Sequence, residues 1–69
     1  MLTNICSTDE VIFRFETFMM KQFRYDLDYL RNLPMYQKAI ALINEECDYW
    51  ADHSFWDLYD EATLLSSKI

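Results

Sequence analysis

The fold class is decided by residues 7–34, which read STDEVIFRFETFMMKQFRYDLDYLRNLP. Ser7 and Glu10 match the Ser-x-x-Glu capping box, in which the serine caps the helix and the glutamate bonds back to the serine amide. Apolar residues then recur every three or four positions, at Ile12, Phe15, Met19, Phe23, Leu27 and Leu30. Because these residues fall within about 120° of a helical wheel, they predict one amphipathic helix over about 8–31.

The Asn-Leu-Pro triplet at residues 32–34 is expected to end this helix. Leu33 precedes proline and is pushed away from the α region, while Asn32 suits a left-handed position at a helix C-terminus. Pro34 suits the first turn of a new helix. A second apolar stripe then predicts a helix over about 34–52, at Tyr36, Ala39, Ile40, Ile43, Cys47, Trp50 and Ala51. Because the connection is short, the two helices should form an antiparallel hairpin.

The last segment has two interpretations. In the first, Ser54 is a new N-cap that opens a short helix over about 55–66. In the second, the stripe of the preceding helix continues through Leu58 to about Ser66 without a break. We favour the break, because only the break places both Phe55 and Tyr59 on an apolar face. The expected fold is therefore all-α, a single domain over residues 1–69, with a three-helix bundle that dimerises.

Composition narrows the class of protein. The chain has 69 residues, of which 52% are hydrophobic and 17% aromatic, and it has no glycine. This composition argues against disorder, and the length excludes a large catalytic scaffold. The longest apolar run, residues 39–43, is far too short to span a bilayer. Residues 1–10 have no basic stretch of the kind that opens a secretory signal, so we expect a cytoplasmic protein.

Two cysteines are present, Cys6 and Cys47, and they could form at most one intramolecular disulfide. Nothing else in the sequence suggests an oxidising compartment. Since a free cysteine commonly behaves as a small buried hydrophobe, we interpret both as free thiols.

Apolar side chains exceed what one stripe per helix can bury. The surplus lies on the flanks of the first two predicted helices, at Phe13, Phe18, Met20, Tyr25, Tyr29, Met35, Leu42 and Tyr49. An exposed apolar surface rich in aromatics and methionine is typical of interface cores. We therefore expect these residues to form a dimer or partner interface. The alternative is that the short third helix covers one flank and that tyrosine hydroxyls reach water on the other.

Charge is divided unevenly along the chain. Residues 1–40 carry five acidic and five basic side chains, whereas residues 41–67 carry seven acidic side chains and no basic one. The net charge of −6 argues against unaided binding to nucleic acid or to an anionic membrane. Carboxylates three or four residues apart on a helix lie at about the spacing of phosphates along a strand. The face that we expect to bind a partner comprises Glu45, Asp48, Asp52, Asp57 and Asp60. The alternative is a hydrated face that only keeps the protein soluble.

No residue pattern supports catalysis. The only histidine is His53, and the residue three before it is Trp50 rather than the glutamate of a helical di-metal site. The chain lacks a Cys-x-x-Cys pair and the glycine of a calcium or phosphate loop. We therefore expect no enzyme, no metal and no cofactor.

These features predict a small acidic interaction protein that self-associates, binds a larger protein and modulates it, most simply by inhibition. The carboxylate array would cover a basic nucleic-acid-binding surface as a nucleic-acid mimic. In size, acidity and helical hairpin the chain resembles phage- or plasmid-encoded inhibitors and antitoxins, a likeness of gross properties only. The alternative function is an assembly subunit, in which the aromatic flanks form a permanent homo-oligomer. A third hypothesis, direct nucleic-acid binding, would use the basic residues Arg14, Lys21, Arg24, Arg31 and Lys38.

Overall fold

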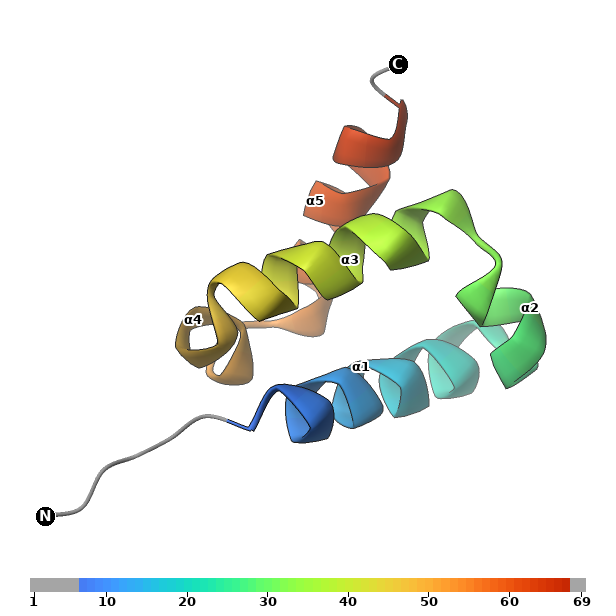
Figure 1. Cartoon of the computed structure of the whole chain (residues 1–69). Helices are drawn as coiled ribbons and strands as arrows, with labels where there is room; N and C mark the ends of the chain where they lie inside the picture. The colour runs from blue at the N-terminus through green and yellow to red at the C-terminus, as the bar shows by residue number, and fades with distance from the viewer. Residues whose placement is uncertain (1–6, 68–69) are drawn as a thin grey trace, which may run out of the picture.

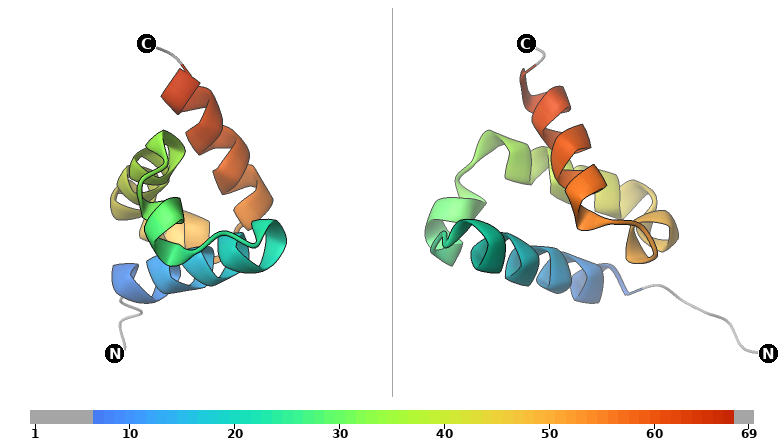
Figure 2. Two further views of the ribbon diagram at one scale, coloured as in Figure 1. Left: turned by 90° about the vertical axis from the view of Figure 1, so that its right-hand side faces the viewer. Right: turned by 180° about the vertical axis from the view of Figure 1, so that it is seen from behind.

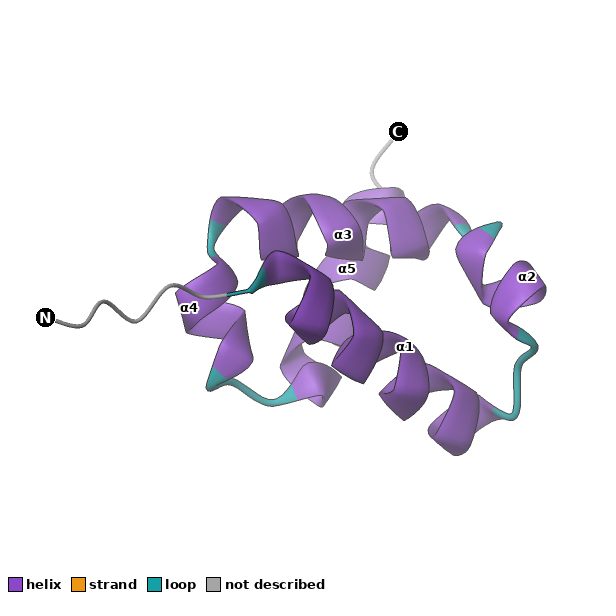
Figure 3. Ribbon diagram, turned by 60° about the horizontal axis from the view of Figure 1, so that its bottom comes forward, coloured by secondary structure: helices purple, strands orange, loops and turns teal. Residues whose placement is uncertain are grey.

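The computed structural model describes residues 7–67, and over this range it contains five α-helices and no strand. The helices are α1 (Thr8–Phe23), α2 (Leu27–Arg31), α3 (Pro34–Glu45), α4 (Cys47–Ala51) and α5 (Phe55–Ser67). Short loops join them (Figure 3). The all-α class is therefore confirmed.

The single helix predicted over residues 8–31 is wrong, because the chain breaks at Arg24. Arg24 adopts a left-handed conformation with φ 60° and ψ 31°, and its N–H donates to the Met20 carbonyl at 2.8 Å. The left-handed position was expected at Asn32, which is instead right-handed with φ −94°. The bend redirects α2 so that Leu30 is fully buried. The helical periodicity therefore identified Leu30 as a core residue but not the turn that places it there.

The helix predicted over residues 34–52 also divides in two, at Glu46 with φ −138° and ψ 64°. Its start at Pro34 is confirmed, with the proline in the first turn of α3. The favoured break before residue 55 is confirmed as well. Ser54 Oγ accepts a hydrogen bond from the Trp56 amide at 3.1 Å, as an N-cap should. At the other end of the chain Ser7 caps α1, accepting from the Glu10 amide at 3.3 Å.

Helices α3 and α5 pack closely against each other, and α1 packs against α2, α3 and α4. Figure 1 shows α1 and α3 running in opposite directions, with α2 connecting them at one end and α4 following α3 at the other end. The view from behind places α5 across α3 (Figure 2). The expected three-helix bundle is not confirmed, since the described residues form five helices instead. Within residues 7–67, none of these helices has the length and apolar character that a membrane span requires.

The core lies where these helices meet. Its buried apolar residues are Val11, Phe15, Met19, Leu30, Met35, Tyr36, Ala39, Ile43, Trp50, Leu58 and Ala62. Most of them belong to the predicted stripes. Ile12, Phe23 and Leu27, which were also expected in the core, are only partly buried. Val11 and Met35 take part in the core instead.

One charged side chain is buried in this core. Glu16, in α1, is 5% exposed, and its Oε2 accepts hydrogen bonds from the Tyr36 hydroxyl at 2.5 Å and from Arg31 Nε at 3.2 Å. The carboxylate thereby links α1 to α2 and α3. Burial, together with the bond to Glu16, raises the pKa of Tyr36 above its usual value.

Cys47 begins α4 and is disulfide-bonded, so its interpretation as a free thiol is wrong. Cys6, the other residue of that interpretation, lies outside the described residues.

Candidate functional site

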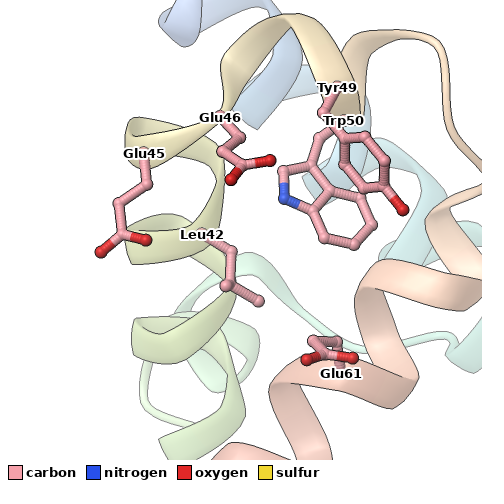
Figure 4. A pocket seen from close by; sticks show the side chains of 6 residues that line it. All are labelled: Leu42, Glu45, Glu46, Tyr49, Trp50 and Glu61. Carbon is pink, nitrogen blue, oxygen red and sulfur yellow. The ribbon is translucent and has the colours of Figure 1, made fainter.

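A pocket of about 280 Å³ lies where α3, α4 and α5 meet. Its lining comes from α3, from the break after it, from α4 and from α5, and comprises Leu42, Glu45, Glu46, Tyr49, Trp50 and Glu61 (Figure 4). The break at Glu46 is what turns α4 across the end of α3 and gives the pocket its aromatic side. A continuous helix over residues 34–52 would not have produced this corner.

The pocket has one aromatic side and an acidic surround. Trp50 is 7% exposed and meets the exposed Tyr49 edge to face, with ring centroids 4.7 Å apart. The carboxylate of Glu46 points toward the indole, and Glu61 approaches from α5 (Figure 4). Glu45, Glu46 and Glu61 are all exposed. Neither of the two ion pairs found within residues 7–67 involves them. Their charges are therefore available to a cationic ligand.

The carboxylates do not form a metal centre. Within the described part of the chain, no group of three or more His, Cys, Asp or Glu side chains could hold a metal ion. The pocket therefore suits an organic cation better than a small metal ion, and its carboxylates come from α3, from the break after it and from α5.

His53 ties the end of α4 to the start of α5. Its Nε2 lies 3.2 Å from the Tyr49 hydroxyl and 3.1 Å from Asp57 Oδ2. The imidazole also stacks on the Tyr49 ring, with centroids 4.3 Å apart. Asp57 was expected to face a partner freely, and it instead already has a polar neighbour in the chain. It is exposed, so this contact is weak.

The other residues of the predicted acidic face are exposed, but they do not follow one helix. Glu45 belongs to α3, Asp48 to α4 and Asp60 to α5, while Asp52 is the residue that ends α4. This face was expected over two helices, with a break before residue 55, and the break at Glu46 divides it once more. What the fold provides is a set of exposed carboxylates over three helices, of which Glu45 also lines the pocket.

The predicted apolar surface is divided by the structure. Phe13 is 65% exposed, Tyr29 54% and Tyr49 48%. Phe18, Met20, Tyr25 and Leu42 are only partly exposed. Met35 is only 7% exposed, so its assignment to the surface is wrong. It lies in the first turn of α3 and belongs to the core.

Much of the aromatic surplus is used within the chain. Phe18 contacts Phe55 and Trp56 with ring centroids 5.6 and 5.0 Å apart. Phe23 contacts Trp56 and Tyr59 at 5.9 and 5.2 Å. The alternative in which the last helix covers one flank of the first is therefore correct for Phe18. An interface on this side would have to use the residues that stay exposed.

Sequence reasoning did not assign Glu46, Trp50 and Glu61 to a site. Trp50 was placed in the core, where it lies, but the open side of its ring depends on the turn at Glu46. The adjacent acids Glu45 and Glu46 were the available signal in the sequence, whereas nothing in the sequence indicated that Glu61 lies near them. Comparisons of the chain with models of protein families, with curated proteins and with solved structures found no match.

Proposed function

We propose that the chain is a small acidic interaction protein that binds a larger protein through the surface of α3, α4 and α5 and inhibits it. The partner surface would be rich in lysine and arginine, of the kind that binds nucleic acid. The observation that carries the proposal is the exposure of all seven acidic side chains of residues 41–67, a stretch without lysine or arginine. A local excess of negative charge attracts a basic surface and repels nucleic acid itself.

The structure alters the form of this proposal. Carboxylates on three helices cannot reproduce the regular phosphate spacing of a nucleic-acid strand as one straight helix would. A basic surface would therefore be recognised mainly by charge, around one specific pocket. Affinity should then fall steeply with salt, because the charges are exposed and screened.

The test uses the full chain immobilised and a lysate of the native host. In the test variant Glu45, Asp48, Asp52, Asp57 and Asp60 become Gln or Asn. We expect the wild type to retain nucleic-acid-binding proteins that elute as the salt concentration rises. When these proteins are purified, addition of the chain should displace their nucleic acid. The five-residue variant should retain none of them.

A matched pair of double variants controls for net charge: Asp48→Asn with Asp60→Asn, and Asp9→Asn with Asp28→Asn, all four positions being exposed. Retention that neither salt nor the five-residue variant changes would contradict the proposal.

A second function, a subunit of a helical homo-oligomer, is favoured by the exposure of Phe13 and Tyr29. Phe18 is a poor test of it, because Phe18 packs on Phe55 and Trp56 inside the chain. Sedimentation of Phe13→Asp is the better test, since this side chain is mostly exposed and its loss should leave the fold intact. If the wild type sediments as a dimer and the variant as a monomer, the assembly function is supported. A monomeric wild type at all concentrations would exclude it.

The cytoplasmic location stays a prediction. A disulfide at Cys47 is more typical of oxidising compartments, and trapping of thiols in intact host cells would decide between the two.

A further inference from the structure

We propose that the pocket between α3, α4 and α5 receives one arginine side chain of a protein partner. The inference rests on the proposed function, because a basic partner surface supplies that side chain. It goes further by assigning a defined ligand group to a defined site.

The edge of the pocket is acidic. Glu45, Glu46 and Glu61 present carboxylates from different elements, and none of them is engaged by a base within residues 7–67. A guanidinium group is planar and offers five N–H donors in a fixed fork, so it can bond to more than one carboxylate at once. A compact ammonium group offers three donors from a single atom and suits separated acceptors less well.

Trp50 supplies a feature of the pocket that is independent of the acidic side chains. Its ring is more than nine-tenths buried, yet its indole N–H has no hydrogen-bond acceptor among the described residues. No side-chain nitrogen sealed from solvent in residues 7–67 lacks a partner, so this N–H is accessible to solvent, and Trp50 lines the pocket. Figure 4 shows the nitrogen on the ring edge that faces Leu42 and Glu46. An otherwise buried donor that opens to a pocket is suited to an acceptor on a ligand.

These two requirements together select the ligand. The carboxylates need donors, and the indole N–H needs an acceptor. A guanidinium has no acceptor, but an arginine within a peptide brings a main-chain carbonyl close to its side chain. A free polyamine lacks this acceptor. The aromatic rings and Leu42 give the methylene stem of arginine an apolar contact, and the guanidinium plane can stack on an aromatic face.

The size of the pocket agrees with this assignment. Pockets for drug-sized ligands and cofactors usually enclose about 300–1,000 Å³. At about 280 Å³ this pocket lies at the lower limit of that range, so it has room for one long side chain.

The experiment follows the two indole N–H signals of the ¹⁵N-labelled full chain by NMR. Trp56 is 48% exposed and does not line the pocket, so its signal is an internal control for Trp50. Trp50→Phe and Trp56→Phe assign the two signals. The probe is an N-acetylated, C-amidated Gly-Arg-Gly peptide, and the control is the same peptide with neutral citrulline in place of arginine. We expect a saturable shift of the Trp50 signal with the arginine peptide, little change at Trp56 and no saturable shift with citrulline.

Matched variants locate the effect. Glu61→Gln should weaken binding of the arginine peptide about three- to ten-fold, the range for loss of one partly exposed charged hydrogen bond. Asp60→Asn removes the same charge from the neighbouring position outside the pocket and should leave this affinity unchanged. A circular dichroism spectrum and a melting curve show that each variant is folded.

Three results would overturn the inference: an unmoved Trp50 signal, equal binding of the citrulline peptide, or equal binding of a Gly-Lys-Gly peptide. Its failure is distinguishable from failure of the proposed function. If the Trp50 signal does not move while nona-arginine still binds in a salt-dependent manner that Asp48→Asn with Asp60→Asn weakens, only the arginine pocket is wrong. If nona-arginine does not bind either, both proposals are wrong.

Discussion

At the scale of single residues, two polar residues determine how the helices meet. Arg24 takes a left-handed conformation that favours glycine, in a chain that has none. Glu16 accepts hydrogen bonds from two other helices through one oxygen. Both residues lie within the single amphipathic helix that the periodicity predicted over about 8–31. The conformation of Arg24 should lower the free energy of unfolding, and the hydrogen bonds of Glu16 should raise it.

Arg24→Gly should stabilise the protein. A non-glycine residue in the left-handed region costs about 1–2 kcal/mol, and the added freedom of glycine in the unfolded chain offsets part of the gain. We expect a net gain of about 0.5–1 kcal/mol in the free energy of unfolding, measured by urea denaturation. Lys21→Gly, at an exposed position inside α1, should instead lose about 1 kcal/mol. Equal losses in the two variants would contradict the role given to Arg24.

Tyr36→Phe should destabilise the protein by about 1.5–3 kcal/mol, because it removes a hydrogen bond to a buried carboxylate. Arg31 cannot replace it fully, since the side chain of Arg31 is 53% exposed.

The same residue predicts a pH dependence. The pKa of Tyr36 is raised in the folded state by burial and by Glu16, so its contribution is complete below the unfolded value of 10.0 and is lost as the pH rises above it. The stability difference between wild type and Tyr36→Phe should therefore be constant up to about pH 9 and shrink at higher pH. Urea denaturation of both proteins between pH 7 and pH 11.5 measures it. A difference that grows above pH 10 would contradict the sign.

At the scale of helices, short elements are held by caps and by rings. Helices α1 and α5 meet through aromatic side chains. Phe15 and Phe18 contact Phe55, and Phe23 contacts Tyr59. The cap at Ser54 fixes where those turns begin. A short helix has little stability of its own, so its position depends on these contacts.

Ser54→Ala should therefore cost about 1 kcal/mol and should disturb the ring cluster of α5. Ser7→Ala, which removes the cap of α1, should cost a similar amount without affecting that cluster. Thermal unfolding gives the losses, and the near-ultraviolet circular dichroism of the aromatic rings separates the two variants. Identical near-ultraviolet spectra would show that the cap does not position α5.

The sequence predicted much of the fold, and its failures have a common cause. Phe15, Met19, Ile43 and Leu58 were correctly assigned to the core, because helical periodicity is a local property. The breaks at Arg24 and Glu46 were missed, because neither carries glycine or proline and both depend on tertiary packing.

The candidate site was predicted only in its charge. The acidic half of the chain was evident from composition, whereas the pocket required the approach of Glu61 in α5 to Trp50 in α4. Both residues line the pocket, but they belong to different helices, so helical periodicity gives no signal of their proximity.

At the scale of the whole molecule, negative charge is concentrated on the side of α3, α4 and α5. The seven acidic side chains of residues 41–67 are exposed and have only His53 among them as a group able to carry positive charge. Such a surface repels itself and weakens the folded state.

Sodium chloride should therefore stabilise the protein. We expect the melting temperature to rise by a few degrees between about 0.02 and 0.5 M salt, because the Debye length shortens to a few ångströms. Glu45→Gln with Asp60→Asn should reduce this rise, and Asp9→Asn with Asp28→Asn should reduce it less. A melting temperature that falls with salt would show that attractive ion pairs outweigh repulsion.

Ala39 and Ala62 are both fully inaccessible, on the two helices that pack against each other, α3 and α5. A larger side chain at either position would push the helices apart, so the fold tolerates little variation there. Exposed positions such as Gln37 and Thr63 can change freely. Distant homologues that retain this architecture should therefore keep small residues at those two alanines, separated by 23 positions, long after their surface residues have diverged.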